Sequence, residues 1–407
     1  ISWSDHFTVE QRFAVYCTIK QSRLKNQNYA ALVVTVGIAD YFRKKTGKRP
    51  SVDTTSPDIR IHVHIHKERI SVSLDISGES LHKRGYRVAG GPASLKENAA
   101  AALLLRAGWK ELTLQKETLK PAFVDPMCGS GTIVIEAAMI AADIPAGMFK
   151  RSFGFSSWKQ HQPGVWNKIV DEGKRGIDKN NIGPIAGYDK DPRAVQAAQA
   201  NIKEAGLADY IHIEKRDISK ATPPDTPGCT SGLVAVNPPY GVRLGEKAAL
   251  KELYQTLGKT LIHHFRGWKA GVLSSDKELS FALGLRAGKT NYLYNGAIKC
   301  LLTCFALHED NVYHHPPASI SGAVVDEALE NRLKKNLKRI SKWARRNNIT
   351  SYRLYDADLP DYAAAIDYFE GTYLHIQEYA PPPEIDAAKA AHRLQTLVDA
   401  VCRVAGI

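Results

Sequence analysis

The chain has 407 residues, 44% of them hydrophobic and 24% charged, with a formal net charge of +13. These proportions are those of a globular protein, and the length suggests two or three domains at roughly 100–200 residues each. No apolar stretch reaches the about 18 residues that a membrane-spanning helix needs, and no signal peptide opens the chain, so we expect no membrane partner. The positive charge favours a polyanionic partner such as nucleic acid over a merely basic enzyme.

The six cysteines are scattered, which favours reduced thiols and a cytoplasmic protein over a disulfide framework. Cys300 and Cys304 have a spacing that a metal site can use. They lie in an apolar, strand-like run with no second ligand pair nearby, so we expect buried thiols and no metal.

Residues 1–82 are predicted to form an α+β domain. A strand is expected over 12–19, a helix over 29–44 with Ala31, Val34, Ile38 and Phe42 as its apolar stripe, and two alternating strands over 59–66 and 70–76. His62, His64 and His66 alternate with apolar residues and resemble a row of metal ligands. Because no carboxylate or cysteine cluster accompanies them, the sequence favours a half-exposed strand.

Basic side chains gather around the predicted helix of this first domain and are candidates for contacts with RNA phosphates. They are Arg23, Lys25, Arg43, Lys44, Lys45, Lys48 and Arg49.

Residues 83–315 alternate strands with helices, which predicts a parallel, doubly wound α/β sheet of the Rossmann type. Strands are expected over 122–125, 185–189, 211–214, 232–237, 270–274 and 299–307, and the last of these is placed where an antiparallel strand is often added. Residues 147–183 interrupt this alternation and are predicted to be an inserted helical segment.

A linker is predicted at 311–320, where prolines and histidines carry no periodicity. Residues 316–407 then form a small α+β segment, with a basic helix over 326–347, strands over 352–355 and 373–378, and a helix over 384–404.

Four motifs occur in the central region in the order that a nucleoside-binding sheet requires. The first is Asp125-Pro-Met-Cys-Gly-Ser-Gly-Thr at a strand-to-helix turn. Gly129 and Gly131 permit a tight turn and the close approach of a ligand to the backbone. A dinucleotide-binding loop has a third glycine three residues later, and Val134 stands there instead.

The second and third motifs place one aspartate after each of the next two strands. Asp189 ends Gly187-Tyr-Asp189 and can accept both ribose hydroxyls of a nucleoside, although it can also cap the helix that begins at Pro192. Asp217 can accept a hydrogen bond from an adenine amine, and on its own it can equally be a cap.

The fourth motif, Asn237-Pro-Pro-Tyr240, follows an apolar strand and is the most specific signal in the chain. The Asn237 side-chain oxygen and the Pro238 carbonyl can accept hydrogen bonds from the two N–H groups of an aromatic amine. This arrangement favours a pyramidal, nucleophilic nitrogen. Tyr240 can stack on an extruded base. The alternative is a Pro-Pro turn without a chemical role.

Residues 125–131 and 237–240 together resemble class I methyltransferases that act on amino groups. Residues 57–63 and 75–87 resemble the later half of an RNA-binding THUMP domain, and the whole chain is similar to the bifunctional large-subunit ribosomal RNA methyltransferases of the K/L type. The resemblance implies S-adenosylmethionine as cofactor. It implies a cofactor-binding set of Asp125, Pro126, Cys128, Gly129, Gly131, Asp189, Asp217 and Asn237, and a catalytic set of Asn237, Pro238 and Tyr240.

The family's first half makes N2-methylguanine in 23S rRNA and its second half makes N7-methylguanine. Compared with the family pattern, we expect the early THUMP region to lie before Ile1 and the second catalytic domain to lie after Ile407. We therefore expect N2 methylation here, with residues 316–407 as the leading part of the second half.

Three alternatives stay open. An adenine-N6 DNA methylase uses the same Asn-Pro-Pro-Tyr motif, but the THUMP-like region favours RNA. A protein glutamine methyltransferase uses it too, but its substrate does not explain the charge of +13. A noncatalytic RNA-binding scaffold is disfavoured by the intact set of Asp125, Asp189, Asp217 and Asn237.

Overall fold

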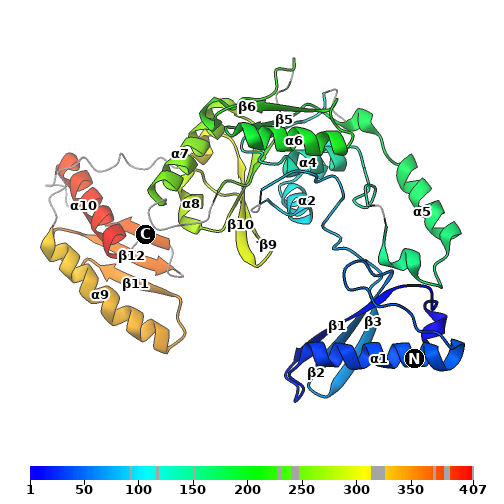
Figure 1. The fold of residues 1–407 in the computed structure, drawn as a ribbon. Helices are drawn as coiled ribbons and strands as arrows, with labels where there is room; N and C mark the ends of the chain where they lie inside the picture. The colour runs from blue at the N-terminus through cyan, green and yellow to red at the C-terminus, as the bar shows by residue number, and fades with distance from the viewer. Residues whose placement is uncertain are drawn as a thin grey trace. The chain divides into compact units, whose positions relative to one another are not determined.

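The computed structural model describes most of the chain, and its ribbon is shown in Figure 1. The described residues are 1–91, 94–115, 119–150, 152–227, 229, 231–239, 247–312, 326–369, 373–379 and 386–405. Tyr240 and most of the predicted 311–320 linker lie outside them. Residues Ile1–Tyr313 form one compact unit and His314–Ile407 form a second.

The N-terminal region of the first unit is a three-stranded sheet covered on one face by a long helix (Figure 1). Its elements are β1 (Phe13–Lys20), α1 (Gln27–Thr46), β2 (Ile59–His66) and β3 (Arg69–Leu74). β1 runs parallel to β2, and β2 runs antiparallel to β3. The predicted strands and helix of this region are confirmed.

Local sequence explains both ends of α1 and the face that it buries. The Asn26 side chain accepts a hydrogen bond from the Tyr29 N–H at the first turn, and Gly47 takes a left-handed φ of 73° after the last. Ile38 and Phe42 are buried against the apolar face of β2. Ala31 and Val34 are only partly buried, so the predicted stripe is deepest in the second half of the helix.

The central sheet of the first unit has seven strands in the order β6-β5-β4-β7-β8-β10-β9. They are β4 (Ala122–Asp125), β5 (Ile185–Asp189), β6 (Ile211–Lys215), β7 (Gly232–Val236), β8 (Lys269–Ser274), β9 (Lys289–Asn295) and β10 (Ile298–Ala306). The first five in this order run parallel, and β10 is antiparallel to both β8 and β9. The doubly wound sheet and its late antiparallel strand were predicted, whereas β9 was not.

Helices cover both faces of this sheet and create two apolar layers. One layer is formed with α2 (Glu97–Arg106), α3 (Trp109–Thr113), α4 (Thr132–Ala141) and α6 (Pro192–Glu204). The other is formed with α7 (Lys247–His264) and α8 (Lys277–Ala282). β4 is the middle one of the five parallel strands and is buried along its whole length.

The predicted insertion at 147–183 is helical and contacts the N-terminal region. It contains η2 (Gly154–Ser157), α5 (Pro163–Arg175) and η3 (Lys179–Asn181). The Phe155 N–H donates to the Ile76 carbonyl at 3.0 Å, and the Trp158 indole N–H lies 3.2 Å from His6 Nδ1. The insertion therefore ties residues near the start of the chain to the segment that follows α4.

The second unit contains a three-stranded antiparallel sheet of order β11-β12-β13. Its elements are α9 (Glu327–Arg346), β11 (Ser351–Asp356), β12 (Ala364–Phe369), β13 (Tyr373–Glu378) and α10 (Ala387–Ala405). Leu329 and Leu333 of α9 and Leu397 and Val401 of α10 share one apolar core with the sheet. Every element except β12 was predicted.

Candidate active site

The order of the strands identifies the edge of the central sheet where a ligand can bind. β5 and β6 lie on one side of β4 and β7 lies on the other, so the winding direction reverses between β4 and β7. In open α/β sheets, ligands bind beyond the carboxyl ends of the strands at such a reversal. Asp125 ends β4 and Asn237 directly follows β7, which places both predicted residues at this edge.

Two buried oxygens at this edge have no hydrogen-bond partner within the described protein. Asp125 is 1% exposed; its Oδ1 accepts from the Met127 N–H at 3.1 Å, but its Oδ2 accepts from no group. The Asn237 Oδ1 is also buried without a partner. Leaving a buried acceptor unpaired costs about 1–3 kcal/mol, so these oxygens fit a ligand that donates hydrogen bonds.

The Asp125 carboxyl also has perturbed electrostatics. Burial raises the pKa of Asp125 well above its ordinary value, and the nearby charge of Asp189 raises it further. A positively charged ligand group beside Asp125 would favour the ionised form of the carboxyl. The carboxyl is thus suited to a ligand that is both cationic and a hydrogen-bond donor.

The two glycines of the β4–α4 loop have different roles. Gly129 has a φ of +53°, and a Cβ added to it would meet nothing within 4 Å. Gly131 has a φ of +80°, and its added Cβ would lie 3.1 Å from the Cβ of Ala198 in α6. Gly129 therefore leaves room for a ligand beside the backbone, whereas Gly131 is also required for the packing of α6.

Asp189 at the end of β5 connects that strand to the glycine loop. Its Oδ2 accepts from the Gly129 N–H at 3.0 Å, and its Oδ1 accepts from the Asp191 N–H at 2.9 Å. The cap of α6 is Asp191, which accepts from the Arg193 N–H. The alternative in which Asp189 caps this helix is therefore wrong.

Asp217 after β6 lines a cavity of about 430 Å³. Its Oδ1 accepts hydrogen bonds from both the N–H and the hydroxyl of Ser219. Asp217 thereby caps η4 (Ile218–Lys220), and these hydrogen bonds lower the pKa of Asp217. The cavity is lined by Lys190, Asp217, Ile218, Pro239, Ala249, Leu250, Glu252, Leu253 and Thr256. Residues that follow β5, β6 and β7 thus meet around one partly apolar space that suits a flat heteroaromatic ring.

The remaining predicted site residues are buried parts of the two loops. Pro126, Cys128 and Pro238 are buried. The Cys128 N–H donates to the Tyr188 carbonyl at 2.8 Å, and burial raises the pKa of the Cys128 thiol well above its ordinary value. Cys128 therefore packs the glycine loop onto β5 as a neutral thiol. Ile218 and the apolar residues of α7 that line the cavity were missed, because an apolar side chain beside Asp217 carries no distinctive sequence signal.

Two polar residues that were not predicted fasten the segment before α2 to the glycine loop. Asn201 of α6 is 1% exposed; its Oδ1 accepts from the N–H groups of Val88 and Ala89, and its Nδ2 donates to the carbonyls of Ala89 and Ser130. The Arg87 guanidinium donates to Ser130 Oγ and Thr132 Oγ1. These residues are far apart in sequence, so no local pattern indicates the contact.

The seven predicted RNA-binding residues are all exposed, but the structure separates them into two groups. Arg23 and Lys25 precede α1, while Arg43, Lys44, Lys45, Lys48 and Arg49 lie at or beyond its last turn. A helix of 20 residues is roughly 30 Å long, so the groups are at opposite ends of α1. Arg43 and Arg49 both pair with Asp40, at 3.3 and 2.7 Å.

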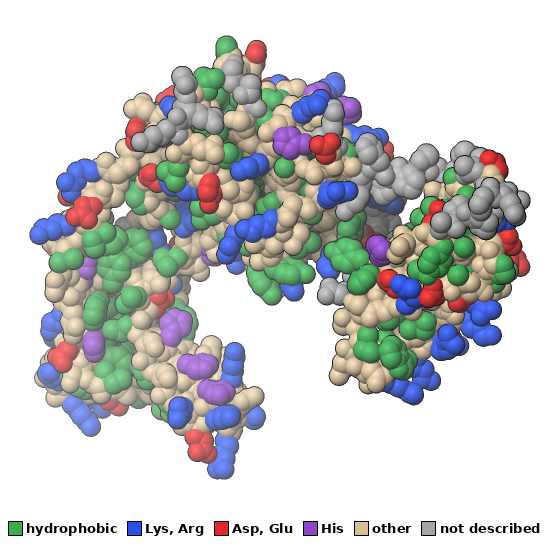
Figure 2. All heavy atoms as spheres, turned by 180° about the vertical axis from the view of Figure 1, so that it is seen from behind, with side chains coloured by type: hydrophobic (Ala, Val, Ile, Leu, Met, Phe, Trp, Pro, Cys, Tyr) green, Lys and Arg blue, Asp and Glu red, His purple; other side chains and the backbone are tan. Residues whose placement is uncertain are grey.

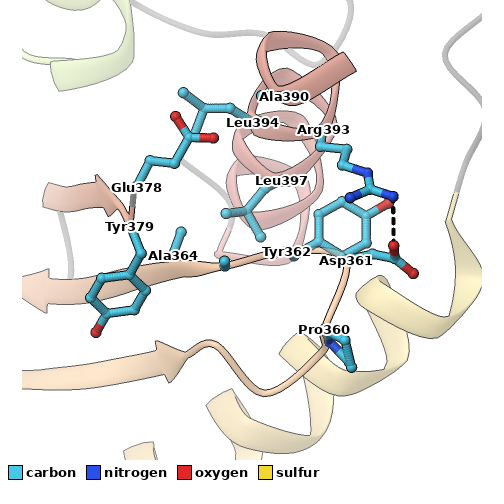
Figure 3. A pocket seen from close by; sticks show the side chains of 11 residues that line it. Pro360, Asp361, Tyr362, Ala364, Glu378, Tyr379, Ala390, Arg393, Leu394 and Leu397 are labelled. Carbon is cyan, nitrogen blue, oxygen red and sulfur yellow. Dashed lines mark hydrogen bonds and ion pairs between the residues drawn. The ribbon is translucent and has the colours of Figure 1, made fainter. Parts of the chain in front are cut away.

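A separate cavity of about 180 Å³ lies within the second unit, between the β12–β13 sheet and α10 (Figure 3). Arg393 pairs with Asp361 at 2.7 Å at its edge. None of the described residues predicted for cofactor binding or catalysis lines it. In the described parts of the chain, no helix combines the length and apolar character that crossing a membrane requires.

Comparison with known proteins places the two regions of the first unit in known families. Residues 84–304 match the family described as RMKL-like, methyltransferase domain, and residues 1–75 match the THUMP domain. A curated relative from Allochromatium vinosum, named ribosomal RNA large subunit methyltransferase K/L, is 45% identical over 97% of this chain and 54% of its own length. One of the same name from Pseudomonas aeruginosa is 41% identical over all of this chain and 58% of its own length.

The chain thus spans little more than half the length of these relatives. Among solved structures, a putative methyltransferase complexed with SAH is 30% identical, with a TM-score of 0.63 over 75% of this chain and 77% of its own. A protein from Listeria monocytogenes described as a predicted N6-adenine-specific DNA methylase is also 30% identical, with a TM-score of 0.62 over 75% of each chain. The predicted fold class and family are confirmed: the chain belongs to the RMKL-like methyltransferases and carries an N-terminal THUMP domain.

Proposed function

We propose that this chain transfers a methyl group from S-adenosylmethionine to the exocyclic N2 amine of a guanine in 23S rRNA. The observation that carries the proposal is the Oδ1 of Asn237, which is buried at the switch point of a methyltransferase sheet with no hydrogen-bond partner among the described residues. The names of the large-subunit rRNA methyltransferase relatives support an rRNA substrate. The THUMP domain and the net charge of +13 support RNA over protein as the partner.

The residues at the switch point fit S-adenosylmethionine, which supplies an electrophilic methyl group on a sulfonium. Asp125 offers a buried carboxyl oxygen to a cationic donor, and the backbone at Gly129 leaves space beside it. Asp189 is assigned to the ribose hydroxyls, and Asp217 with its cavity is assigned to the adenine ring. The solved relative with bound SAH supports the same class of ligand.

The chain's own part in the reaction is to prepare the amine. The Asn237 Oδ1 and the Pro238 carbonyl accept hydrogen bonds from the two N–H groups of the amine. The nitrogen lone pair is then less delocalised into the base and can attack the methyl carbon. The two prolines stiffen the loop and add no N–H donors that would compete for these oxygens. Tyr240 is assigned to stacking on the base.

The direct test is methylation of 23S rRNA from a strain that lacks the gene, followed by identification of the modified nucleoside by mass spectrometry. N2-methylguanosine at a single position is the expected product. N6-methyladenosine would instead support the function suggested by the name of the Listeria monocytogenes relative, and would show that the loop is correctly assigned but the base is not. No methyl transfer to RNA would refute the proposal.

The exposed basic residues at the two ends of α1 are proposed to contact RNA phosphates. Reversing the charge of Lys44 and Lys48 should weaken RNA binding and make it less dependent on salt, since each phosphate that is no longer neutralised removes about 0.7–0.9 from the logarithmic salt slope. Cofactor affinity measured by calorimetry should not change, because these residues are not among those assigned to the cofactor.

A further inference from the structure

One face of the THUMP sheet is polar and rich in rings. Along β2, Ile61, Val63 and Ile65 are buried beneath α1, while the three histidines between and after them point to the opposite side and are exposed. Residues paired directly across strands share a face, so the register extends this surface onto β1 and β3. The histidine face consists of Tyr16, Thr18, Lys20, His62, His64, His66, Arg69, Ser71 and Ser73.

The rings on the histidine face form two stacked pairs. The rings of Tyr16 and His62 lie 5.3 Å apart with an interplanar angle of 25°, and those of His64 and His66 lie 6.4 Å apart at 10°. His64 Nδ1 is 2.9 Å from the Thr18 hydroxyl, which orients the imidazole. Figure 2, which views the molecule from behind, shows histidine side chains close together on this domain beside Lys and Arg side chains.

The charge of this surface is positive. The strands β1, β2 and β3 contain no aspartate or glutamate, and they contribute Lys20, Arg60 and Arg69. Two acids lie at the rim: exposed Glu68 in the hairpin turn and half-buried Asp75 after β3, whose carboxylate is 3.7 Å from His62. The β2–β3 turn adds Lys67, whose N–H donates to the Lys20 carbonyl. Lys20, Lys67 and Arg69 therefore gather at the His66 end of the ring pairs, whereas Arg60 lies at the opposite end of β2.

We propose that the histidine face binds single-stranded RNA, with bases stacked on its rings and phosphates held by Lys20, Arg69 and Lys67. Stacking surfaces next to cations are what single-stranded nucleic acid requires. A protein partner is less suited, because the centre of a stable protein interface is apolar and the aliphatic side chains of β2 lie on the other face. The inference rests on the proposed function for the choice of RNA, and it names residues other than the seven basic residues at the ends of α1.

The first test measures binding of a short, fluorescein-labelled single-stranded RNA of mixed sequence to the 407-residue chain. Replacing His62, His64 and His66 together by alanine should weaken binding by roughly 10- to 100-fold, because stacking contributes about 1–3 kcal/mol per base. His64→Phe keeps a ring and should retain most of the affinity. Lys20→Ala with Arg69→Ala should lower the logarithmic salt slope by about 0.7 for each phosphate that the variant no longer neutralises.

His212→Ala is the matched control. His212 is an exposed imidazole on β6, an edge strand of the central sheet, and its side chain is 67% exposed compared with 52% for His62. This variant should bind RNA like the unmodified chain. Unchanged affinity in the triple variant, or an equal loss in His212→Ala, would overturn the inference.

A second test needs no substitution and so does not depend on how the variants fold. RNA that contains 4-thiouridine is irradiated with the unmodified chain, and the attached peptides are mapped by mass spectrometry. Attachment within 13–20 and 59–74 is expected, and attachment confined to other segments would contradict the proposal. Protection of these histidines from diethylpyrocarbonate by higher protein concentration alone would show that a second copy covers the face, which also overturns it.

The two proposals can fail separately. If the triple variant methylates rRNA as well as the unmodified chain does, the histidine face is not the RNA surface while the proposed function stands. If the unmodified chain binds RNA through this face but transfers no methyl group to it, the proposed function fails instead.

Discussion

The carboxyl edge of the central sheet carries two pairs of oxygen acceptors that differ in whether the protein itself uses them. After β5 and β6, Asp189 and Asp217 accept hydrogen bonds from neighbouring backbone N–H groups. After β4 and β7, Asp125 Oδ2 and Asn237 Oδ1 accept no hydrogen bond from any residue that the structure describes. The first pair stabilises the fold through these hydrogen bonds, so its presence does not by itself indicate a ligand. The second pair only costs folding free energy unless a ligand binds there, so it indicates function more directly.

Asn237→Ala should have the largest effect, and it tests one of the two acceptors that the described protein leaves without a donor. The side-chain oxygen is assigned to the amine, whose N–H bonds become stronger donors as the nitrogen gains positive charge in the transition state. Losing such an acceptor should lower kcat and kcat/KM together, on the order of 10²–10³-fold, with little change in cofactor affinity. Methylation assays measure the loss of rate, and calorimetry measures the cofactor affinity.

Asn291→Ala is the control for this substitution. The Asn291 Nδ2 on β9 is also buried without a hydrogen-bond partner in the described part of the chain, but β9 lies at the antiparallel end of the sheet. Its loss should leave turnover unchanged. Near-normal turnover of Asn237→Ala would mean that Asn-Pro-Pro-Tyr is only a structural turn in this protein.

Asp189→Ala should have the next largest effect, and it tests an acceptor that the protein does use. Charge-assisted hydrogen bonds contribute about 1.5–3 kcal/mol each, so losing those assigned to the ribose should weaken cofactor binding by roughly 100-fold. The substitution also frees the Gly129 N–H, which would loosen the loop. Asp191→Ala, which removes the cap of α6, should lower the melting temperature but leave cofactor affinity nearly unchanged.

Asp125→Asn separates the effect of the buried carboxyl on folding stability from its effect on cofactor binding. We expect cofactor affinity to fall by roughly 10-fold, because an amide lacks the charge that favours a cationic donor. We also expect the unliganded protein to become more stable at neutral pH, because a neutral amide is cheaper to bury than an ionised carboxyl. The cofactor affinity measured by calorimetry should thus fall, while the melting temperature of the unliganded protein should rise.

The sign of the pH dependence follows from the raised pKa of Asp125 in the folded state. Between the ordinary value of 3.8 and the raised value, the folded protein holds a proton that the unfolded chain has released. This group therefore makes stability fall as pH rises through that window, and its contribution is constant above it. The asparagine variant lacks this contribution, so its stability advantage should grow across the same window. An advantage independent of pH would contradict the assignment.

Sequence predicted most of the sheet because its central strands are short apolar runs between glycine, proline and aspartate. The two missed strands lack that signal. β9 lies at an edge and its residues are mostly exposed, and β12 shows no alternation of apolar and polar residues. The order of motifs also predicted the site residues at the strand ends. It did not predict that Asn201 and Arg87 fasten the segment before α2 to the glycine loop, because the bonds that make this link join residues 43–113 positions apart, which only the folded chain brings together.

Asp217→Asn should have the smallest effect, and it separates two roles that one carboxylate can have. Asparagine caps a helix about as well as aspartate, so the bond from Ser219 and the melting temperature should be kept. An amide that gives its oxygen to Ser219 presents only N–H donors on its other side. It then cannot accept from the adenine amine, and cofactor affinity should fall by roughly 3- to 10-fold, about 1 kcal/mol.

A cofactor analogue that lacks the adenine amine completes the comparison for Asp217. The analogue should bind the unmodified chain more weakly than the natural cofactor does, and Asp217→Asn should remove most of that difference. Such non-additivity is the signature of two groups in direct contact. If the variant and the analogue instead weaken binding independently, Asp217 is a cap like Asp191, and the cavity beside it recognises the ring through Ile218 and Pro239 alone.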